Sequence, residues 1–542
     1  MKRDISDTIR HYHVIPFLVY MIILSVIAPF LSVYIYNKID GFFNSADSNV
    51  ISIAVYVILF LAWAYPVFYI TRETVYHDIT GRNYGYDHGH YRRSYGELVD
   101  YFADADPYLL NAEDLPSEDW HESRGLIIGQ TTINKERRLL KLSQDSGNGT
   151  NLLTLGLPGS GKTMAQIIPS GMKAHGSVLC WDLKGDIFHW TESARKSLGK
   201  KVKCFVPDDA EISCHFNPLH GIQGLDETGR RLFIEKMAFT LIPAETDAAG
   251  KYFTDGARDY WCGICNYLLN QNTNTTFSEI VRAILDGNVF DWTIQIQQSG
   301  IRAASDYTNG YIGSNEKNVS GIWSALTRAV RPFSSGSLAK ILVSSDNEIH
   351  PEDLDDGNTD IYIIIPPQEV DVYAPIASLF VQQCMDFFLS RADRGVSEKI
   401  SPITFLLDEV CQTTISAQTL STFMALGRSK NCSCFLTAQS VMMIRQRFGD
   451  YADQVLDLCQ VISCFSAQSP DSTAWLSKLF GKKKDLRQGN TETMSLGSSL
   501  SLSSQEVLVP VLQPEDFQNL NGYVAVLYFG KHILLERTNA YE

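Results

Sequence analysis

The stretch GLPGSGKT at residues 156–163 matches the pattern G-x-x-x-x-G-K-[ST] without a mismatch. Such a loop follows a buried strand and opens a helix, and its backbone N–H groups cradle the phosphates of a nucleoside triphosphate. The apolar run NLLTL at 151–155 predicts the strand, and KTMAQIIPSGM at 162–172 predicts the helix. The chain is therefore expected to bind ATP with Mg²⁺.

The residues of this loop have separate expected roles. Lys162 is expected to neutralise the β- and γ-phosphates, and the Thr163 hydroxyl is expected to ligate Mg²⁺. The predicted nucleotide-binding residues are Gly156, Leu157, Pro158, Gly159, Ser160, Gly161, Lys162 and Thr163.

A loop of this kind requires an acidic partner on a neighbouring strand, and ITFLLDEV at 403–410 supplies one. The apolar part of this run predicts a central strand, and ligands of α/β sheets bind at the carboxyl ends of strands. Asp408 is expected to hold Mg²⁺ through water, and Glu409 is expected to polarise the attacking water as general base. An ordinary turn at a strand end is the alternative.

Further short apolar runs alternate with helical stretches, which predicts a mostly parallel sheet with helices on both faces. Gln439 follows one of these runs, and if that strand lies beside Asp408 its side chain is placed to sense the γ-phosphate or orient water. The alternative for Gln439 is a surface turn residue. The predicted strands are 177–181, 202–206, 361–365, 434–438 and 461–465.

Two runs of about 20 uncharged residues, 15–36 and 50–70, predict transmembrane helices. Basic residues precede the first run and follow the second, whereas the loop at 37–49 has one lysine against two aspartates. The positive-inside rule therefore places both termini in the cytoplasm and this loop outside.

Composition and net charge limit the class of protein. The 542 residues are 45% hydrophobic and carry a net charge of −15, which excludes a basic DNA-coating protein but permits a local basic groove. The Ser-rich stretch 490–506 is expected to form a flexible loop.

Several segments in chain order resemble the type IV secretion coupling proteins, which are the TraG/TraD-type ATPases of conjugation. SVLCWDLKGDIF at 177–188 resembles their Asp-x-Lys-Gly-Glu segment, with Asp186 in place of the glutamate. The family usually follows its acidic pair with Phe and a later Gly. The sequence DEVCQTT at 408–414 differs, so this loop is expected to differ in shape. Further resemblances lie at 193–219, 251–269, 360–389 and 511–535.

The resemblance implies a RecA-like P-loop motor domain interrupted by an all-helical domain, behind two N-terminal transmembrane helices. The implied domains are a membrane anchor at 1–75, the first part of the nucleotide-binding domain at 76–220, the all-α domain at 221–345 and the second part of the nucleotide-binding domain at 346–542.

The family forms rings of six subunits at the cytoplasmic face of the bacterial inner membrane. ALGRSKNCSC at 425–434 resembles its Gly-Arg-Lys segment, which implies that Arg428 completes the neighbouring subunit's site as an arginine finger. A solvated surface arginine is the alternative for Arg428.

The implied function is an ATPase that couples relaxase-bound single-stranded DNA, effector proteins or both to a type IV secretion channel. A receptor for protein effectors alone is one alternative. A double-strand DNA translocase and a scaffold that uses ATP only to assemble are the others.

Overall fold

The structure is a computed structural model that describes residues 86–87, 90–91, 123–133, 136–144, 149–245, 247–391, 400–492 and 500–538. The chain forms two units, Met1–Ser94 and Tyr95–Glu542. In the first unit, β1 (Tyr86–Asp87) pairs antiparallel with β2 (His90–Tyr91). The expected transmembrane helices at 15–36 and 50–70 and the loop at 37–49 lie outside the described residues.

The second unit contains an eleven-stranded sheet in the order β4-β3-β15-β14-β11-β5-β10-β9-β6-β8-β7. The seven strands from β11 to β7 are all parallel, as the short apolar runs predict. These strands are β5 (Leu152–Leu155), β6 (Ser177–Asp182), β7 (Lys201–Phe205), β8 (Thr359–Ile364), β9 (Ile403–Leu407), β10 (Cys432–Ala438) and β11 (Val461–Cys464).

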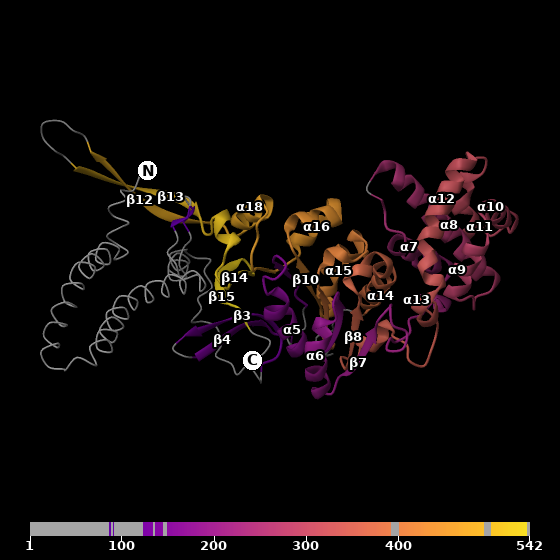
Figure 1. Cartoon of the computed structure of the whole chain (residues 1–542), viewed down its shortest axis with the longest axis horizontal. Coiled ribbons are helices and arrows are strands. Elements are labelled where there is room, and N and C mark those ends of the chain that lie inside the picture. The colour runs from indigo at the N-terminus through magenta and orange to yellow at the C-terminus, as the bar shows by residue number, and fades with distance from the viewer. Residues whose placement is uncertain are drawn as a thin grey trace, which may run out of the picture. The chain divides into compact units, whose positions relative to one another are not determined.

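The parallel part of the sheet is buried on both faces because alternate side chains of its strands enter two different hydrophobic clusters. Leu153 and Trp181 belong to one cluster, together with residues of α14, α15 and α16. Leu152 and Cys180 belong to the other cluster, together with residues of α5 and α6. Figure 1 shows these helices around the strands.

The helices that accompany the sheet follow its strands along the chain. One of them, α14, lies within a stretch at Pro367–Ser390 that is long and apolar enough to cross a membrane. Since α14 packs against α7 and α15 and most of that stretch is buried, it is a core helix. The helices are α5 (Ile168–Lys173), α6 (Asp186–Ser197), α14 (Val370–Ser390), α15 (Ala417–Leu426), α16 (Val441–Phe448), α17 (Ala452–Asp457) and α18 (Pro470–Leu479).

Four antiparallel strands extend the sheet beyond β11, and the list of predicted strands did not include them. They are β3 (Leu126–Ile133), β4 (Glu136–Leu142), β14 (Tyr523–Tyr528) and β15 (Lys531–Glu536). β14 pairs with β11 and β15 pairs with β3, so the C-terminal hairpin joins the parallel strands to an N-terminal hairpin.

Between β7 and β8 the described residues form helices joined by loops, and an isolated bridge joins His215 to Glu348. In α9 the buried residues Phe277, Ile280, Val281 and Ile284 recur at the spacing of one helical face. The central helix α8 packs against its neighbours α7, α9, α10, α11 and α12. The group comprises α7 (Glu227–Leu241), α8 (Ala248–Gln271), α9 (Phe277–Asp286), α10 (Val289–Gln298), α11 (Arg302–Thr308), α12 (Glu316–Val330) and α13 (Gly336–Ile341).

The expectation of a flexible loop at 490–506 is wrong for most of that stretch. β12 (Lys482–Glu492) and β13 (Leu500–Pro510) pair antiparallel along their whole length, and only 493–499 lies outside the described residues. Serine and lysine have little strand propensity of their own, so the ladder of backbone hydrogen bonds to the partner strand decides this structure.

A buried ion pair fastens α6 to the sheet. Arg195 and Asp360 are both fully buried, and Nε and Nη2 of Arg195 each donate to one carboxylate oxygen at 2.8 Å. The guanidinium also donates to the carbonyls of Ala174 and Gly176, and Asp360 accepts the N–H of Val178. Every polar atom of this pair that faces the interior therefore has a hydrogen-bond partner. A buried ion pair is tolerated only when its polar atoms are satisfied in this way.

Replacing Arg195 with Met is expected to lower the free energy of unfolding by about 3–5 kcal/mol, because the Asp360 carboxylate stays buried without its cation. The measurement is urea unfolding of the full chain in detergent, followed by tryptophan fluorescence. The matched control is Lys196→Ala on the same helix, whose exposed pair with Glu192 contributes only about 0.3–0.5 kcal/mol. Equal losses in the two variants would contradict the importance assigned to Arg195.

Candidate nucleotide site

The GLPGSGKT loop joins β5 to the helix that follows it, at the carboxyl edge of the parallel strands. The N–H of Gly156 donates to the carbonyl of Ala438 at the end of β10, which anchors the start of the loop. Gly159 and Gly161 have φ of 75° and 89°, a region that favours glycine. Leu157 accepts the N–H of Ser160 in a tight turn, and Pro158 at the tip is exposed.

The helix after the loop begins with a π-helical turn at Thr163–Ile167 and continues as α5. Pro169 lies inside this continuous helix and has no N–H to give to the carbonyl of Ala165. The hydroxyl of the buried Thr538, near the C-terminal end, donates to that carbonyl instead. The C-terminal segment thereby supports the helix that carries Thr163.

Gln166 fixes the same helix against the sheet. It is buried, its carbonyl accepts the Thr154 hydroxyl at 2.6 Å, and its amide donates to Ser463 at 3.0 Å and to the carbonyl of Ile128. β5, β11 and β3 each supply one of these partners. A fully matched buried amide favours one position of the helix over any alternative.

The acidic pair lies across β10 from the loop, because β10 pairs with β5 on one side and with β9 on the other. Thr437 of β10 donates its hydroxyl to the Asp408 carboxylate at 2.7 Å and accepts the N–H of Glu409 at 2.8 Å. Nζ of Lys162 lies 2.5 Å from Oε1 of Glu409. The structure therefore brings Lys162, Asp408 and Glu409 together at one edge of the sheet.

Glu409 adopts a left-handed backbone conformation, with φ of 51° and ψ of 57°. A non-glycine residue rarely adopts this conformation, and where it occurs it is frequently at a functional site. The sharp turn ends β9 and directs the Glu409 carboxylate to Lys162.

Burial raises the pKa of Asp408 to about 6, and the carboxylates of Glu409 and Asp182 act in the same direction. The hydrogen bond from Thr437 and the charge of Lys162 oppose this shift. A carboxyl group with this pKa is mostly ionised at pH 7 but loses its charge when the pH falls one or two units below 7. A divalent cation beside the group favours the ionised form.

Gln439 directly follows β10, the strand between β5 and β9, so the adjacency that its expected role requires is present. Arg428 precedes β10 and donates its Nε–H to the carbonyl of Gly149, before β5. It thus lies at the amino edge of the sheet, about 20 Å from the loop at roughly 3.3 Å per strand residue. Arg428 cannot reach a nucleotide on its own subunit.

Asp182 is the last residue of β6 and is buried. Its carboxylate accepts the backbone N–H groups of Lys184, Gly185 and Phe188 and so caps the turn into α6. Gly185 has φ of 77°, which explains the glycine in the WDLKGD stretch. Asp182 therefore shapes the backbone beside Asp408.

Arg537, which follows β15, is not among the predicted site residues. Its Nη1 lies 3.5 Å from the point that a Cβ on Gly161 would occupy, and its guanidinium stacks over the Phe465 ring at 5.3 Å. Burial lowers the pKa of Arg537, and its Nε has no hydrogen-bond partner among the described residues. No local motif marks this arginine, because strand pairing alone brings it to the loop.

The raised pKa of Asp408 predicts that Mg²⁺-dependent nucleotide binding weakens by about tenfold for each pH unit below 6, since a proton must leave before the cation binds. The measurement is Mg²⁺ titration of a fluorescent ATP analogue bound to the full chain at pH 5 and 7. Asp408→Asn is the matched control, because the phosphates of the nucleotide titrate equally in both proteins. If nucleotide affinity falls equally with pH in both proteins, Asp408 is not the group whose protonation weakens binding.

Residues 109–535 match the family described as Type IV secretory system Conjugative DNA transfer. The chain is 24% identical over 366 residues to VirD4 of Rhizobium rhizogenes, covering 67% of this chain and 54% of that protein. It is 20% identical over 397 residues to the conjugal transfer protein TraG of Escherichia coli, covering 69% of this chain and 62% of that protein. The aligned region thus spans little more than half the length of the VirD4 relative.

Solved structures of the conjugative coupling protein TrwB share the fold. The unbound TrwBdeltaN70 structure has a TM-score of 0.55 at 13% identity, covering 77% of this chain and 89% of that chain. The plasmid coupling protein TrwB in complex with ADP and Mg²⁺ has a TM-score of 0.54 at 12% identity, covering 76% of this chain and 88% of that chain. The second unit therefore shares the α/β fold of these TrwB structures. Because the family match extends over most of the sequence, the chain belongs to the type IV secretory system conjugative DNA transfer family.

Proposed function

We propose that the chain is a coupling ATPase of a type IV secretion system, which uses ATP hydrolysis to pass conjugative DNA to the secretion channel. The observation that carries the proposal is the convergence of Lys162, Asp408 and Glu409 at the carboxyl edge of a RecA-like sheet. Membership of the conjugative DNA transfer family supports the substrate class.

The proposed chemistry begins with Lys162. Its ammonium group, now paired with Glu409, moves to the β- and γ-phosphates of ATP, and the loop N–H groups of 156–163 hold the same phosphates. Thr163 directly and Asp408 through water would hold Mg²⁺, which would neutralise charge on the phosphates. The Glu409 carboxylate, released from Lys162, accepts a proton from the attacking water. Gln439 orients that water or senses the γ-phosphate.

Arg428 has its proposed role in a neighbouring subunit. It lies at the amino edge of the sheet, so a ring assembly that sets this edge against the carboxyl edge of the next subunit supplies the arginine in trans. A finger of this kind contributes about 10³ to 10⁵ in rate. The proposed assembly is a homohexamer.

The helical group and the N-terminal segments have further proposed roles. The helices between β7 and β8 form a substrate-selecting domain, and the segments 15–36 and 50–70 anchor the chain in the bacterial inner membrane with both termini cytoplasmic. Partners are relaxase-bound single-stranded DNA, effector proteins or both, and components of the channel. An effector-only receptor and a double-strand DNA translocase remain as alternatives.

Arg537 is proposed as a further phosphate ligand, supplied in cis from the C-terminal segment. Its half-buried guanidinium lies against Gly161 and stacks on Phe465, where a phosphate on the loop would be a favourable partner. Arginine suits this position because its planar group stacks and donates two hydrogen bonds at once.

The first test measures ATP hydrolysis by the full chain in detergent, with and without single-stranded DNA, with Lys162→Ala as the blank. Several-fold stimulation by single-stranded DNA is expected, because the cargo enters the ring that the ATPase drives. Absence of stimulation in a preparation shown to be hexameric would replace DNA with protein effectors as the cargo. Stimulation only by double-stranded DNA would favour the translocase.

Replacing Glu409 with Gln is expected to lower kcat by about 10²- to 10⁴-fold, because the general base is lost. Nucleotide affinity is expected to stay equal or to increase, since Lys162 no longer has a competing carboxylate. Steady-state turnover and binding of a fluorescent ATP analogue measure the two effects. Glu192→Gln on α6 is the matched control, and wild-type turnover in the Glu409 variant would remove its assigned role.

Replacing Arg537 with Ala is expected to weaken ATP binding at least tenfold, and Arg537→Lys is expected to recover part of the loss because the charge is retained. The same fluorescent titration measures both variants. The control is Lys531→Ala, an exposed cation on β15. If Arg537→Ala binds ATP as the wild type does, the guanidinium has only a packing role.

A further inference from the structure

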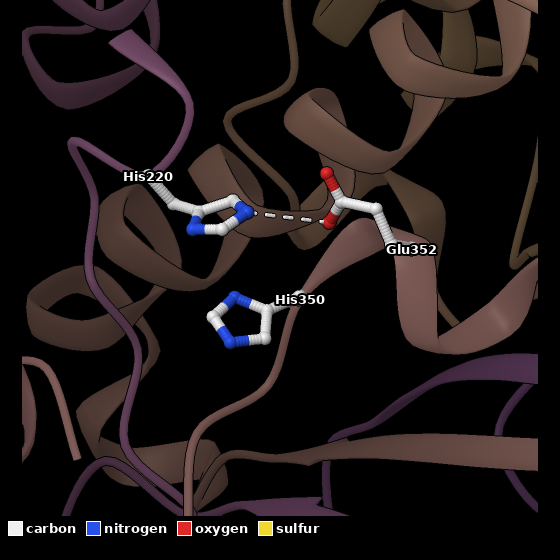
Figure 2. A group of neighbouring side chains, drawn as sticks. All are labelled: His220, His350 and Glu352. Carbon is white, nitrogen blue, oxygen red and sulfur yellow. Dashed lines mark ion pairs between the residues drawn. The ribbon is translucent and has the colours of Figure 1, made fainter. Parts of the chain in front are cut away.

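Two histidines and a glutamate gather at a point that the proposed ATPase chemistry does not use (Figure 2). They are His220, His350 and Glu352, and one ligand atom from each lies within 4.8 Å of the other two. Nε2 of His220 is 3.4 Å from Oε2 of Glu352, and the two imidazole centroids are 4.2 Å apart. Among the described residues this is one group of metal-ligating side chains outside the nucleotide site.

The separations suit a small cation. Tetrahedral zinc with bonds of about 2.0–2.1 Å holds its ligand atoms about 3.3 Å apart. The His220 and Glu352 atoms already have this spacing, and His350 completes the set with a small movement of its ring. Each of the three side chains is partly exposed, so an ion has a path from solvent.

A buried carboxylate organises the turn that carries His220. Glu348 is buried, and its oxygens accept the N–H groups of Asn217 and Ser345. The bond to Asn217 fixes the Asn-Pro-Leu turn that ends at His220, because the Asn217 side chain and carbonyl in turn accept the N–H groups of Leu219 and His220. The ligands therefore need little ordering before an ion binds.

His350 shows the need for a further partner. Its Nδ1 is buried and lies 3.8 Å from Glu348, beyond hydrogen-bonding distance, and no partner for this atom is present among the described residues. A buried polar nitrogen without a partner is unusual in a folded protein. The negative charges of Glu348 and Glu352 beside it favour a cation as the missing partner.

The cluster has a defined place in the chain. His220 lies on the segment that leaves the sheet for helices α7–α13, and His350 and Glu352 lie on the segment that returns to β8. These two segments already pair, since His215 forms a β-bridge with Glu348 and the carbonyl of His215 accepts the N–H of Ile349. An ion held by all three ligands would join the outgoing and returning connections at the base of the helical group.

We propose that His220, His350 and Glu352 bind Zn²⁺, with water as the fourth ligand, and that the ion clamps the two connections of the helical group. Imidazole nitrogen and carboxylate oxygen are ligands that zinc prefers, whereas Mg²⁺ and Ca²⁺ prefer an all-oxygen set. The site is independent of the nucleotide chemistry.

The test is titration of Zn²⁺ into the full chain in detergent, after removal of metal by a chelator and in the absence of nucleotide. One ion per chain is expected, with affinity reduced at least tenfold in His220→Ala, in His350→Ala and in Glu352→Gln. The matched control is His189→Ala, an exposed histidine on α6, which is expected to bind as the wild type does. Wild-type affinity in the first three variants, or no binding by the wild type, would overturn the proposal.

Two further measurements separate this site from other outcomes. The Co²⁺-substituted protein is expected to have the visible absorption of a tetrahedral nitrogen and oxygen site, and a strong thiolate charge-transfer band would assign the ion to a cysteine instead. Zn²⁺ is also expected to raise the thermal unfolding midpoint of the wild type and of His189→Ala but not of His220→Ala, since only a native-state site stabilises the fold. An equal rise in all three proteins would also overturn the proposal.

Discussion

The ion pair between Lys162 and Glu409 is the constraint around which the nucleotide site is built. A buried ammonium group without a counter-charge is too costly to keep, so a lysine in a phosphate loop needs an anion before the phosphates arrive. Glu409 reaches Lys162 because β9 lies one strand beyond β10 and because its left-handed backbone turns the side chain back toward the loop. The order of the strands, the hydrogen bonds that Thr437 makes to the acidic pair and the anchored start of the loop all contribute to this contact.

Residue type and local pattern were sufficient to predict the parallel strands, the loop and the acidic pair. A short apolar run such as 403–407 forms a buried strand whatever its position in the sheet. The antiparallel strands β3 and β4, the β12–β13 hairpin and the position of Arg537 were not predictable in this way. Their conformations depend on pairing between segments far apart in the sequence, and such pairing leaves no periodic signal in the residues themselves.

The two edges of the sheet have different roles in the proposed assembly. The carboxyl edge gathers the acidic pair and the phosphate loop, and the amino edge presents Arg428. A subunit that carries the two halves of a site on opposite edges has no complete site when it is alone. Assembly and hydrolysis are then coupled by geometry, without a separate regulatory element.

The central position of β5 also has a consequence for biogenesis. Leu152 pairs with Phe435 on one side and with Val461 on the other, and Thr538 completes the helix that follows the loop. At ordinary ribosome speeds the first of these partners emerges tens of seconds after β5. The nascent chain must therefore carry β5 as an unpaired apolar strand until β10 has been made. Long-range closure of this kind makes folding slow and leaves the unfinished chain prone to aggregation.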